Sequence, residues 1–168
     1  EVEGIVCSGI DKGKKTTYAL LDERVPPTRE LCREEALARL ASRYFQSHSP
    51  AQLQDFVWWS GLTATECRLA INLIKTELMT ETFDSREYFI HQSWKGKNES
   101  KPVLRLLPAF DEYLISYKNR TDVLPLEHHP KAFNRFGTFY PVILYNGKII
   151  GNWSRSIKKN TIQIEMDF

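Results

Sequence analysis

Residues 49–66 have the sequence SPAQLQDFVWWSGLTATE, and this stretch decides the fold of the central part of the chain. Ser49 is a suitable helix N-cap. Pro50 suits the first helical position, because the N–H that proline lacks would be unpaired there in any case. Gln52 can complete a capping box with this start. The pattern therefore predicts that a helix begins directly after Ser49.

A second helix follows after a short turn. Gly61 ends the first helix, since glycine adopts the left-handed conformation at a helix C-terminus without steric cost. Thr63 then opens the next helix, and Glu66 three residues later completes a capping box. Two helix starts about fourteen residues apart predict a helix-turn-helix, whose second helix has the size that enters a DNA major groove.

The flanking segments complete a three-helix unit with a hairpin. An amphipathic helix is predicted over residues 28–46, and two strands, 79–83 and 88–92, flank a turn at 84–86. This order predicts a winged helix-turn-helix over residues 28–92. The apolar stripes of its three helices are Leu37, Leu40, Ala41, Tyr44 and Phe45; Leu53, Phe56 and Val57; and Cys67, Ala70, Ile71 and Ile74.

The two ends of the chain are predicted to be rich in β-structure. Residues 1–27 contain a hairpin with arms 2–7 and 16–21. Residues 93–168 begin with a polar linker at 93–102, and the sequence of this region favours an antiparallel sheet or small barrel. Its strands are predicted at 103–107, at 110–117, and at 139–145 and 148–153 around Asn146-Gly147, the strongest short hairpin signal. Residues 161–168 alternate strictly, which predicts a half-buried strand. The expected fold class is α+β.

Composition indicates a globular protein. The chain has 168 residues, of which 42% are hydrophobic, enough to bury one sizeable core or two small ones. No run approaches the roughly 20 apolar residues of a membrane span, and no signal-peptide pattern opens the chain. Cys7, Cys32 and Cys67 are odd in number and far apart, so a reducing cytoplasm is expected. Because the chain begins with a hairpin and without Met, we expect a piece of a longer protein.

Charge is unevenly distributed, although the formal net charge is only +2. Residues 28–77 contain six basic and six acidic residues, whereas residues 93–160 contain twelve basic and five acidic ones. A bound polyanion is attracted by local Lys and Arg side chains rather than by total charge. The later segment is therefore expected to supply much of the field.

Two kinds of candidate DNA contact follow. The polar side of the second helix of the helix-turn-helix carries Thr65, Arg68, Asn72 and Lys75. Arg and Asn can each make two hydrogen bonds to base edges, although the same residues also suit an ordinary solvated helix face. Two compact basic clusters at hairpin tips are the candidate phosphate contacts, with solubilising surface charge as the alternative. They are Lys12, Lys14 and Lys15, and Arg155, Lys158 and Lys159.

Other distinctive residues favour structural roles. Trp58 and Trp59 lie about 100° apart on one helix, so both cannot join the same core. Docking against the β-rich part is favoured over base stacking for at least one of them. Asp111 and Glu112, adjacent on an expected strand, point to opposite faces and do not suit acid–base catalysis. His128-His129 has no partner at metal-ligand spacing, so no metal is expected.

Four stretches together resemble the winged-helix DNA glycosylase family, a group of tandem winged helix-turn-helix DNA-binding proteins. They occur in that family's order and span nearly the whole chain. They are residues 17–26 (TYALLDERVP), 55–62 (DFVWWSGL), 106–114 (LLPAFDEYL) and 147–153 (GKIIGNW).

The resemblance implies tandem winged helices followed by a small β-barrel, with a concave DNA-binding surface. It also implies removal of alkylated bases, cross-linked ones included, without a metal or cofactor. The family's catalytic motif has two glutamines, or a glutamine and an aspartate, one residue apart in an N-terminal module. Gln52-Leu53-Gln54 imitates this motif outside that module, so we interpret Gln52 as a capping residue and Gln54 as exposed. The chain is expected to be an inactive C-terminal portion, with residues 1–27 the wing of a preceding winged helix.

Three functional hypotheses remain from the sequence. The first is that the chain is the part of a glycosylase-like repair protein that binds double-stranded DNA. The sequence leaves open whether the full-length protein is catalytically active. The second is a winged-helix transcriptional regulator without chemistry, which predicts a two-fold dimer on paired half-sites. The third is a protein-interaction module in which the helix-turn-helix is only a scaffold. The oligomeric state is left open by the sequence.

Overall fold

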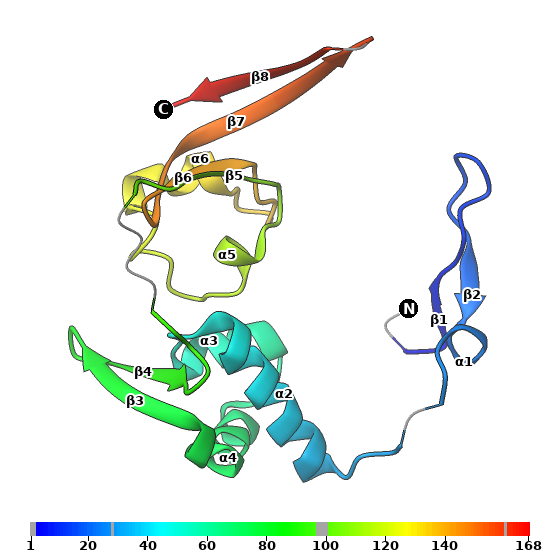
Figure 1. Cartoon of the computed structure of the whole chain (residues 1–168), viewed down its shortest axis with the longest axis vertical. Coiled ribbons are helices and arrows are strands. Elements are labelled where there is room, and N and C mark those ends of the chain that lie inside the picture. Colours follow the sequence, from blue (N-terminus) through cyan, green and yellow to red (C-terminus); the bar gives the residue numbers. More distant parts are fainter. Residues whose placement is uncertain (1–2, 28, 97–100, 160) are drawn as a thin grey trace. The chain divides into compact units, whose positions relative to one another are not determined.

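The computed structural model describes residues 3–27, 29–96, 101–159 and 161–168 (Figure 1). The chain divides into two compact units, Glu1–Cys32 and Arg33–Phe168. Helices and strands occur together, and the strands form three antiparallel sheets of two, two and four strands in the described part. The second unit holds two hydrophobic cores, one among helices and one in the β-rich part. None of the helices in these ranges has the length and apolarity needed to cross a membrane.

The first unit contains the expected hairpin in a shorter form. Strand β1 (Val6–Ser8) pairs with β2 (Tyr18–Leu20), and the intervening loop is narrowed by a bridge between Lys12 and Lys15. The second arm ends before the predicted residue 21, because residues Leu21–Arg24 turn into a short helix, α1. Val2, where the first arm was predicted to begin, lies outside the described residues.

The helical core is built by three helices, α2 (Arg33–His48), α3 (Leu53–Ser60) and α4 (Ala64–Leu73). All three predicted apolar stripes face this core, which confirms the periodicity argument. Helix α2 begins later than predicted. Thr28 lies outside the described residues, and residues 29–32 are not helical. Glu34 and Glu35 favour the observed start, because acidic side chains stabilise the first turn of a helix.

The predicted start of α3 is wrong by three residues. Ala51 forms a β-bridge with Phe89, with N–H to carbonyl distances of 3.1 and 2.8 Å, so residues 49–51 are not helical. Gln52, rather than Ser49, is the N-cap, and its backbone N–H donates to the Asp55 carboxylate at 2.9 Å. A tertiary pairing therefore overrides the local helix-start signal of Ser49-Pro50.

The turn from α3 into α4 agrees with the prediction. Gly61 has a φ of 70° at the end of α3, and the capping box between Thr63 and Glu66 is present. Arg33 pairs with the same carboxylate. Hydrogen bonds from Arg33 and then from Thr63 lower the pKa of Glu66 to about 2. The start of α4 is thus fixed both locally and by the first residue of α2.

The predicted hairpin after the three helices is confirmed. A single 3₁₀ turn (Lys75–Glu77) leads into β3 (Leu78–Phe83), which pairs with β4 (Arg86–His91) around Asp84 and Ser85. Strand β4 lies against the helical core, where the Phe89 ring meets that of Phe45 at a centroid distance of 5.7 Å. The hairpin is therefore anchored along one strand.

The second core lies beneath a four-stranded sheet in the order β5–β6–β7–β8. Its strands are β5 (Leu104–Leu107), β6 (Val142–Tyr145), β7 (Lys148–Lys158) and β8 (Thr161–Asp167). The short helices α5 (Glu112–Ile115) and α6 (His129–Ala132), and the 3₁₀ turn η2 (Leu126–His128), accompany the sheet. Asn146 and Gly147, with φ of 47° and 80°, form the predicted turn. Part of the predicted linker, residues 97–100, lies outside the described residues.

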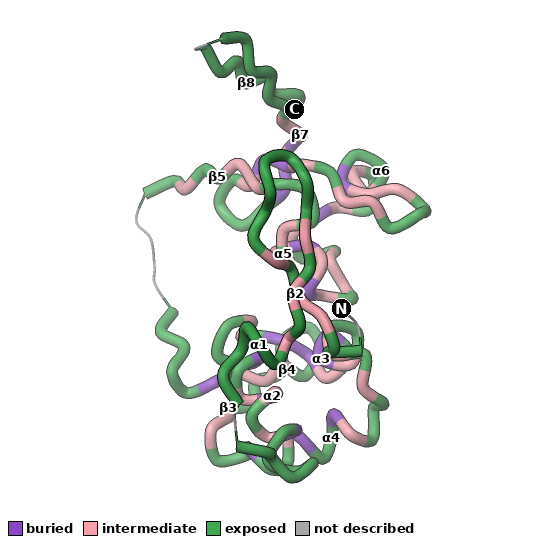
Figure 2. The backbone as a smooth tube through the Cα atoms, turned by 90° about the vertical axis from the view of Figure 1, so that its right-hand side faces the viewer, coloured by how far each residue is buried: buried purple, intermediate pink, exposed green. Residues whose placement is uncertain are grey.

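Four predictions in this region are wrong. Strand β7 continues to Lys158 instead of ending at residue 153. Residues 110–117 are not a strand, because the Asp111 carboxylate accepts the Tyr113 N–H at 2.9 Å and caps the helical turn α5. Strand β6 begins at Val142 rather than at residue 139. Strand β8 is exposed along its whole length instead of half-buried, since β7 and β8 extend past the other two strands (Figures 1 and 2). The alternation predicted the strand correctly, but it did not show whether another element covers one face of that strand.

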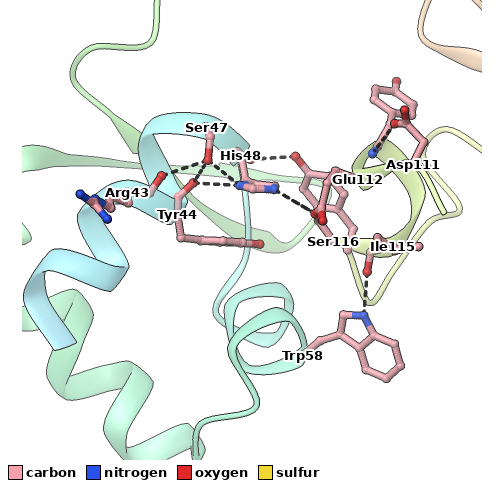
Figure 3. A network of polar contacts seen from close by, with 11 residues as sticks. Arg43, Tyr44, Ser47, His48, Trp58, Asp111, Glu112, Ile115 and Ser116 are labelled. Carbon is pink, nitrogen blue, oxygen red and sulfur yellow. Dashed lines mark hydrogen bonds and ion pairs between the residues drawn. The ribbon is translucent and has the colours of Figure 1, made fainter. Parts of the chain in front are cut away.

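Residues 115–118 join the two cores, and Figure 3 shows the contacts of Ile115 and Ser116. The His48 Nε2 atom lies 3.1 Å from the Ser116 hydroxyl, and the Tyr117 hydroxyl donates to the His48 carbonyl at 3.0 Å. Burial raises the pKa of Tyr117 to about 12, so this hydroxyl keeps its proton at neutral pH. The Lys118 N–H donates to the Asp55 carboxylate at 2.9 Å. The Asp55 side chain therefore serves both the start of α3 and the contact between the cores.

Candidate nucleic-acid interface

A groove of about 750 Å³ lies beside helices α3 and α4 of the second unit. Its walls come from α3, from the start of α4, from the β3–β4 turn and from Lys118. The left-handed Gly61 brings α4 back beside α3, and the turn at Asp84 and Ser85 brings the start of β4 to the opposite side. The lining residues are Gln52, Leu53, Gln54, Val57, Trp58, Gly61, Leu62, Ala64, Arg68, Ser85, Arg86, Glu87 and Lys118.

The outer face of α4 is open to solvent, as a groove-reading helix requires. Thr65, Arg68 and Asn72 are exposed, and so is Lys75 in the following 3₁₀ turn. Of these four predicted contacts, Arg68 alone lines the groove. Leu69 and Leu73, each 40% exposed, lie on the same open side, so this face is less polar than the prediction assumed.

The cations of the groove differ in their availability. Arg86 makes two hydrogen bonds to the Asp122 carboxylate, at 3.1 and 2.9 Å. This pairing raises the pKa of Arg86 and lowers that of Asp122. Arg68 and Lys118, in contrast, form no ion pair with any described residue. They, rather than Arg86, are the groove cations without an ionic partner in the described part, with Glu87 as the acidic residue nearby.

The two tryptophans of α3 have different environments. The Trp58 Nε1–H donates to the Ile115 carbonyl at 2.9 Å, which confirms the expected docking against the β-rich part (Figure 3). The residue is nevertheless 52% exposed and lines the groove. Trp59 packs on Tyr44, with ring centroids 5.0 Å apart, and does not line the groove. Trp58 therefore belongs both to the junction of the cores and to the open surface.

The two glutamines that imitate a catalytic motif occupy the positions predicted for them. Gln52 is 8% exposed and caps α3, whereas Gln54 is exposed. The Gln54 amide nitrogen donates to the Gln52 side-chain oxygen at 2.7 Å. This bond uses the Gln52 oxygen within the protein, and Gln54 itself lines the groove.

The predicted basic clusters are only partly compact. Lys12, Lys14 and Lys15 are exposed around the narrow loop of the first unit. Arg155 is not in a loop: it lies within β7 opposite Ile164, and Lys158 pairs with Thr161 at the end of the same strand. Because successive side chains on a strand alternate between faces, Arg155 and Lys158 point to opposite faces. Lys159 is in the turn itself, with a φ of 50°.

Asp111 and Glu112 make separate contacts in the structure. The Asp111 side chain caps α5, and the Glu112 carboxylate accepts a hydrogen bond from Ser116. No group of three His, Cys, Asp or Glu side chains that could hold a metal ion occurs among the described residues.

Comparison with known proteins identifies the family. The profile of the family described as "DNA glycosylase AlkZ-like" matches residues 2–168. The chain belongs to the AlkZ-like DNA glycosylase family. A curated relative, the interstrand DNA cross-link repair glycosylase of Streptomyces sahachiroi, is 25% identical over 159 residues, which cover 89% of this chain and 43% of the relative.

A solved structure of an AlkZ-like protein has the same fold. The Streptomyces sahachiroi DNA glycosylase AlkZ superimposes with a TM-score of 0.76 and 20% identity, over 96% of this chain and 45% of that protein. The chain therefore spans less than half the length of both proteins.

Two groove residues of this AlkZ-like chain were not predicted as contacts. Lys118 stands in the run Tyr117-Lys118-Asn119-Arg120, which the sequence marks as polar and aromatic without assigning a function. Arg86 was assigned only to a turn. Their place beside α4 depends on the pairing of the two cores and on the β3–β4 register, and neither leaves a local sequence signal.

Proposed function

We propose that this chain is the DNA-binding C-terminal portion of an AlkZ-like DNA glycosylase that repairs alkylated bases in double-stranded DNA. The observation that carries this proposal is the groove beside α4, where Arg68 and Lys118 are unpaired within the described part of a DNA glycosylase family member. The cross-link repair activity named for the Streptomyces sahachiroi relative supports cross-linked bases as substrates of the parent protein.

The helical part acts as a winged helix in this proposal. Three helices followed by an antiparallel hairpin occur in the order that a winged helix-turn-helix has, with α4 as recognition helix and β3–β4 as wing. The hairpin of residues 1–27 is the wing of a preceding winged helix. Residues 28–92 and 93–168 are then the winged-helix and β domains.

Catalysis belongs to a different part of the parent protein. The Gln52 side chain is buried at the α3 N-terminus and already hydrogen-bonded to Gln54. A water-directing residue needs a free polar atom at the sugar carbon under attack. We therefore assign Gln52 and Gln54 no catalytic role and expect this portion alone to release no base.

A salt titration of duplex binding tests the proposal. Binding through phosphates weakens steeply as salt rises, and losing one phosphate contact lowers the slope of log K against log salt by about 1. Arg68→Ala should show this lower slope. Arg39→Ala, which removes an equal charge from an exposed position on α2 outside the groove lining, should leave the slope unchanged.

Three outcomes would change the assignment. Absent or salt-independent binding would remove DNA and favour a protein-interaction module. Tight binding to one sequence, without base release from alkylated duplex by the parent, would favour a transcriptional regulator. Base release by this portion alone, lost in Gln54→Ala, would move catalysis into the groove described here.

A further inference from the structure

We propose that the open face of Trp58 is a stacking site for one unpaired nucleobase of bound DNA. This inference rests on the proposed function only in assuming that DNA reaches the groove. It assigns a specific contact to a residue that the family resemblance leaves without a role.

The Trp58 ring is held in place before any ligand arrives. The hydrogen bond from its Nε1–H to the Ile115 carbonyl fixes one edge at 2.9 Å (Figure 3). The Arg120 guanidinium lies 5.7 Å from the ring centroid. Arg120 is itself fixed, because its Nε–H donates to the Leu114 carbonyl at 2.5 Å. A pre-oriented ring loses little conformational entropy when a base stacks on it.

Trp58 is also exposed in a way that its structural contacts do not require. Its indole N–H is hydrogen-bonded and its ring contacts Arg120. The residue is nevertheless 52% exposed and lines the groove. Trp59, the next residue, packs its ring against Tyr44 and is less exposed, at 37%. A flat aromatic surface at a groove wall suits any nucleobase, because every base has a π-face.

The surroundings of the ring fit a nucleotide. Gln54 precedes Trp58 by four residues on α3, so the two side chains lie on the same helix face. The Gln54 amide can hydrogen-bond a base edge. Arg68 and Lys118, both unpaired in the described part, line the same groove and complement the charge of flanking phosphates.

The base must be unpaired for a geometric reason. Within a duplex, neighbouring bases cover both faces of each base, and stacking on a side chain requires that the base leave this stack. The groove is open and measures about 750 Å³, within the approximate range of 300–1,000 Å³ seen for small-molecule sites. It can therefore receive a nucleotide that remains attached to its strand.

The test compares two duplexes of identical sequence, one fully paired and one with a single bulged nucleotide. The wild-type chain should prefer the bulged duplex by about 5- to 150-fold, the range that one aromatic stacking contact supplies. Trp58→Leu should abolish this preference while leaving the salt slope on paired duplex unchanged, and Trp58→Tyr should retain part of it. Trp94→Leu, which removes a 45% exposed ring outside the groove lining, is the matched control and should keep the preference.

A measurement on the unmodified chain covers the case in which a Trp58 variant fails to fold. 2-Aminopurine placed at the bulge should lose fluorescence on saturation, because stacking on the indole quenches it. Salt-dependent binding to paired duplex without any bulge preference, or with unquenched 2-aminopurine, would overturn the stacking site and leave the proposed function standing. Absence of all DNA binding would overturn both.

Discussion

The three-helix core and the β7–β8 hairpin both follow regular sequence patterns, but the apolar side chains are buried in the first and exposed in the second. Every apolar stripe predicted for the helices is covered, and Phe45 and Phe56 are fully buried. On β8 the alternation is equally regular, but all seven residues are exposed. The register sets Ile157 opposite Ile162, and Trp153 opposite Met166, so one face of the hairpin is largely apolar.

This difference teaches what periodicity can and cannot show. A repeat of 3.6 or of 2 determines which side chains share a face. It does not determine whether another element lies against that face. For the helices, short connections bring three stripes together, whereas β7 and β8 extend beyond the strands that could carry a covering layer (Figure 1). Substitutions in the two regions should therefore differ greatly in their effects.

Phe56→Ala should give the largest loss of stability, about 3–5 kcal/mol in the free energy of unfolding, because it opens a cavity in the closed helical core. Urea unfolding measures it. Phe83→Ala is the control, since Phe83 is 71% exposed on β3 and should change stability by no more than about 0.5 kcal/mol. Equal effects at both positions would contradict the closed core.

Asp55→Ala should destabilise by about 1–3 kcal/mol, because the backbone N–H groups of Gln52 and Lys118 lose their acceptor. Hydrogen exchange at the Lys118 amide should accelerate in this variant. Asp55→Asn keeps one acceptor oxygen and should show a smaller change. Unchanged Lys118 exchange in Asp55→Ala would contradict a role for this carboxylate in joining the two cores.

Glu66→Gln should change the pH dependence of stability. The folded-state pKa of Glu66 is about 2, below its ordinary value of 4.5, so the carboxylate contributes stability above about pH 4.5 that is lost as pH falls toward 2. The variant should lose stability at pH 7 and show a shallower decline between pH 4.5 and 2. Thermal unfolding across this range measures it. Glu81→Gln, at an exposed position without a hydrogen bond in the described part, should leave the profile unaltered.

Ile164→Ala should have the smallest effect, within about 0.5 kcal/mol, because Ile164 is 49% exposed on β8. Ile149→Ala, at a 4% exposed position in the same sheet, should cost about 2–5 kcal/mol. A loss above about 1 kcal/mol for Ile164→Ala would show that another surface covers the apolar face of the hairpin in solution.

The sequence by itself determined the features that depend on neighbours within one helical turn or one hairpin. These include the residues that share the apolar face of each of the three helices, the Thr63–Glu66 capping box and the turn at Asn146-Gly147. Each is local, because its hydrogen bonds or shared faces join residues only a few positions apart.

Only the tertiary structure decided where α3 begins and which cations line the groove together with Trp58. The first depends on the pairing of Ala51 with Phe89, and the last on Asp55 holding the backbone of Lys118, 63 residues away. Such contacts join segments whose separation in sequence carries no periodic signal, so their geometry emerges only when the cores pack.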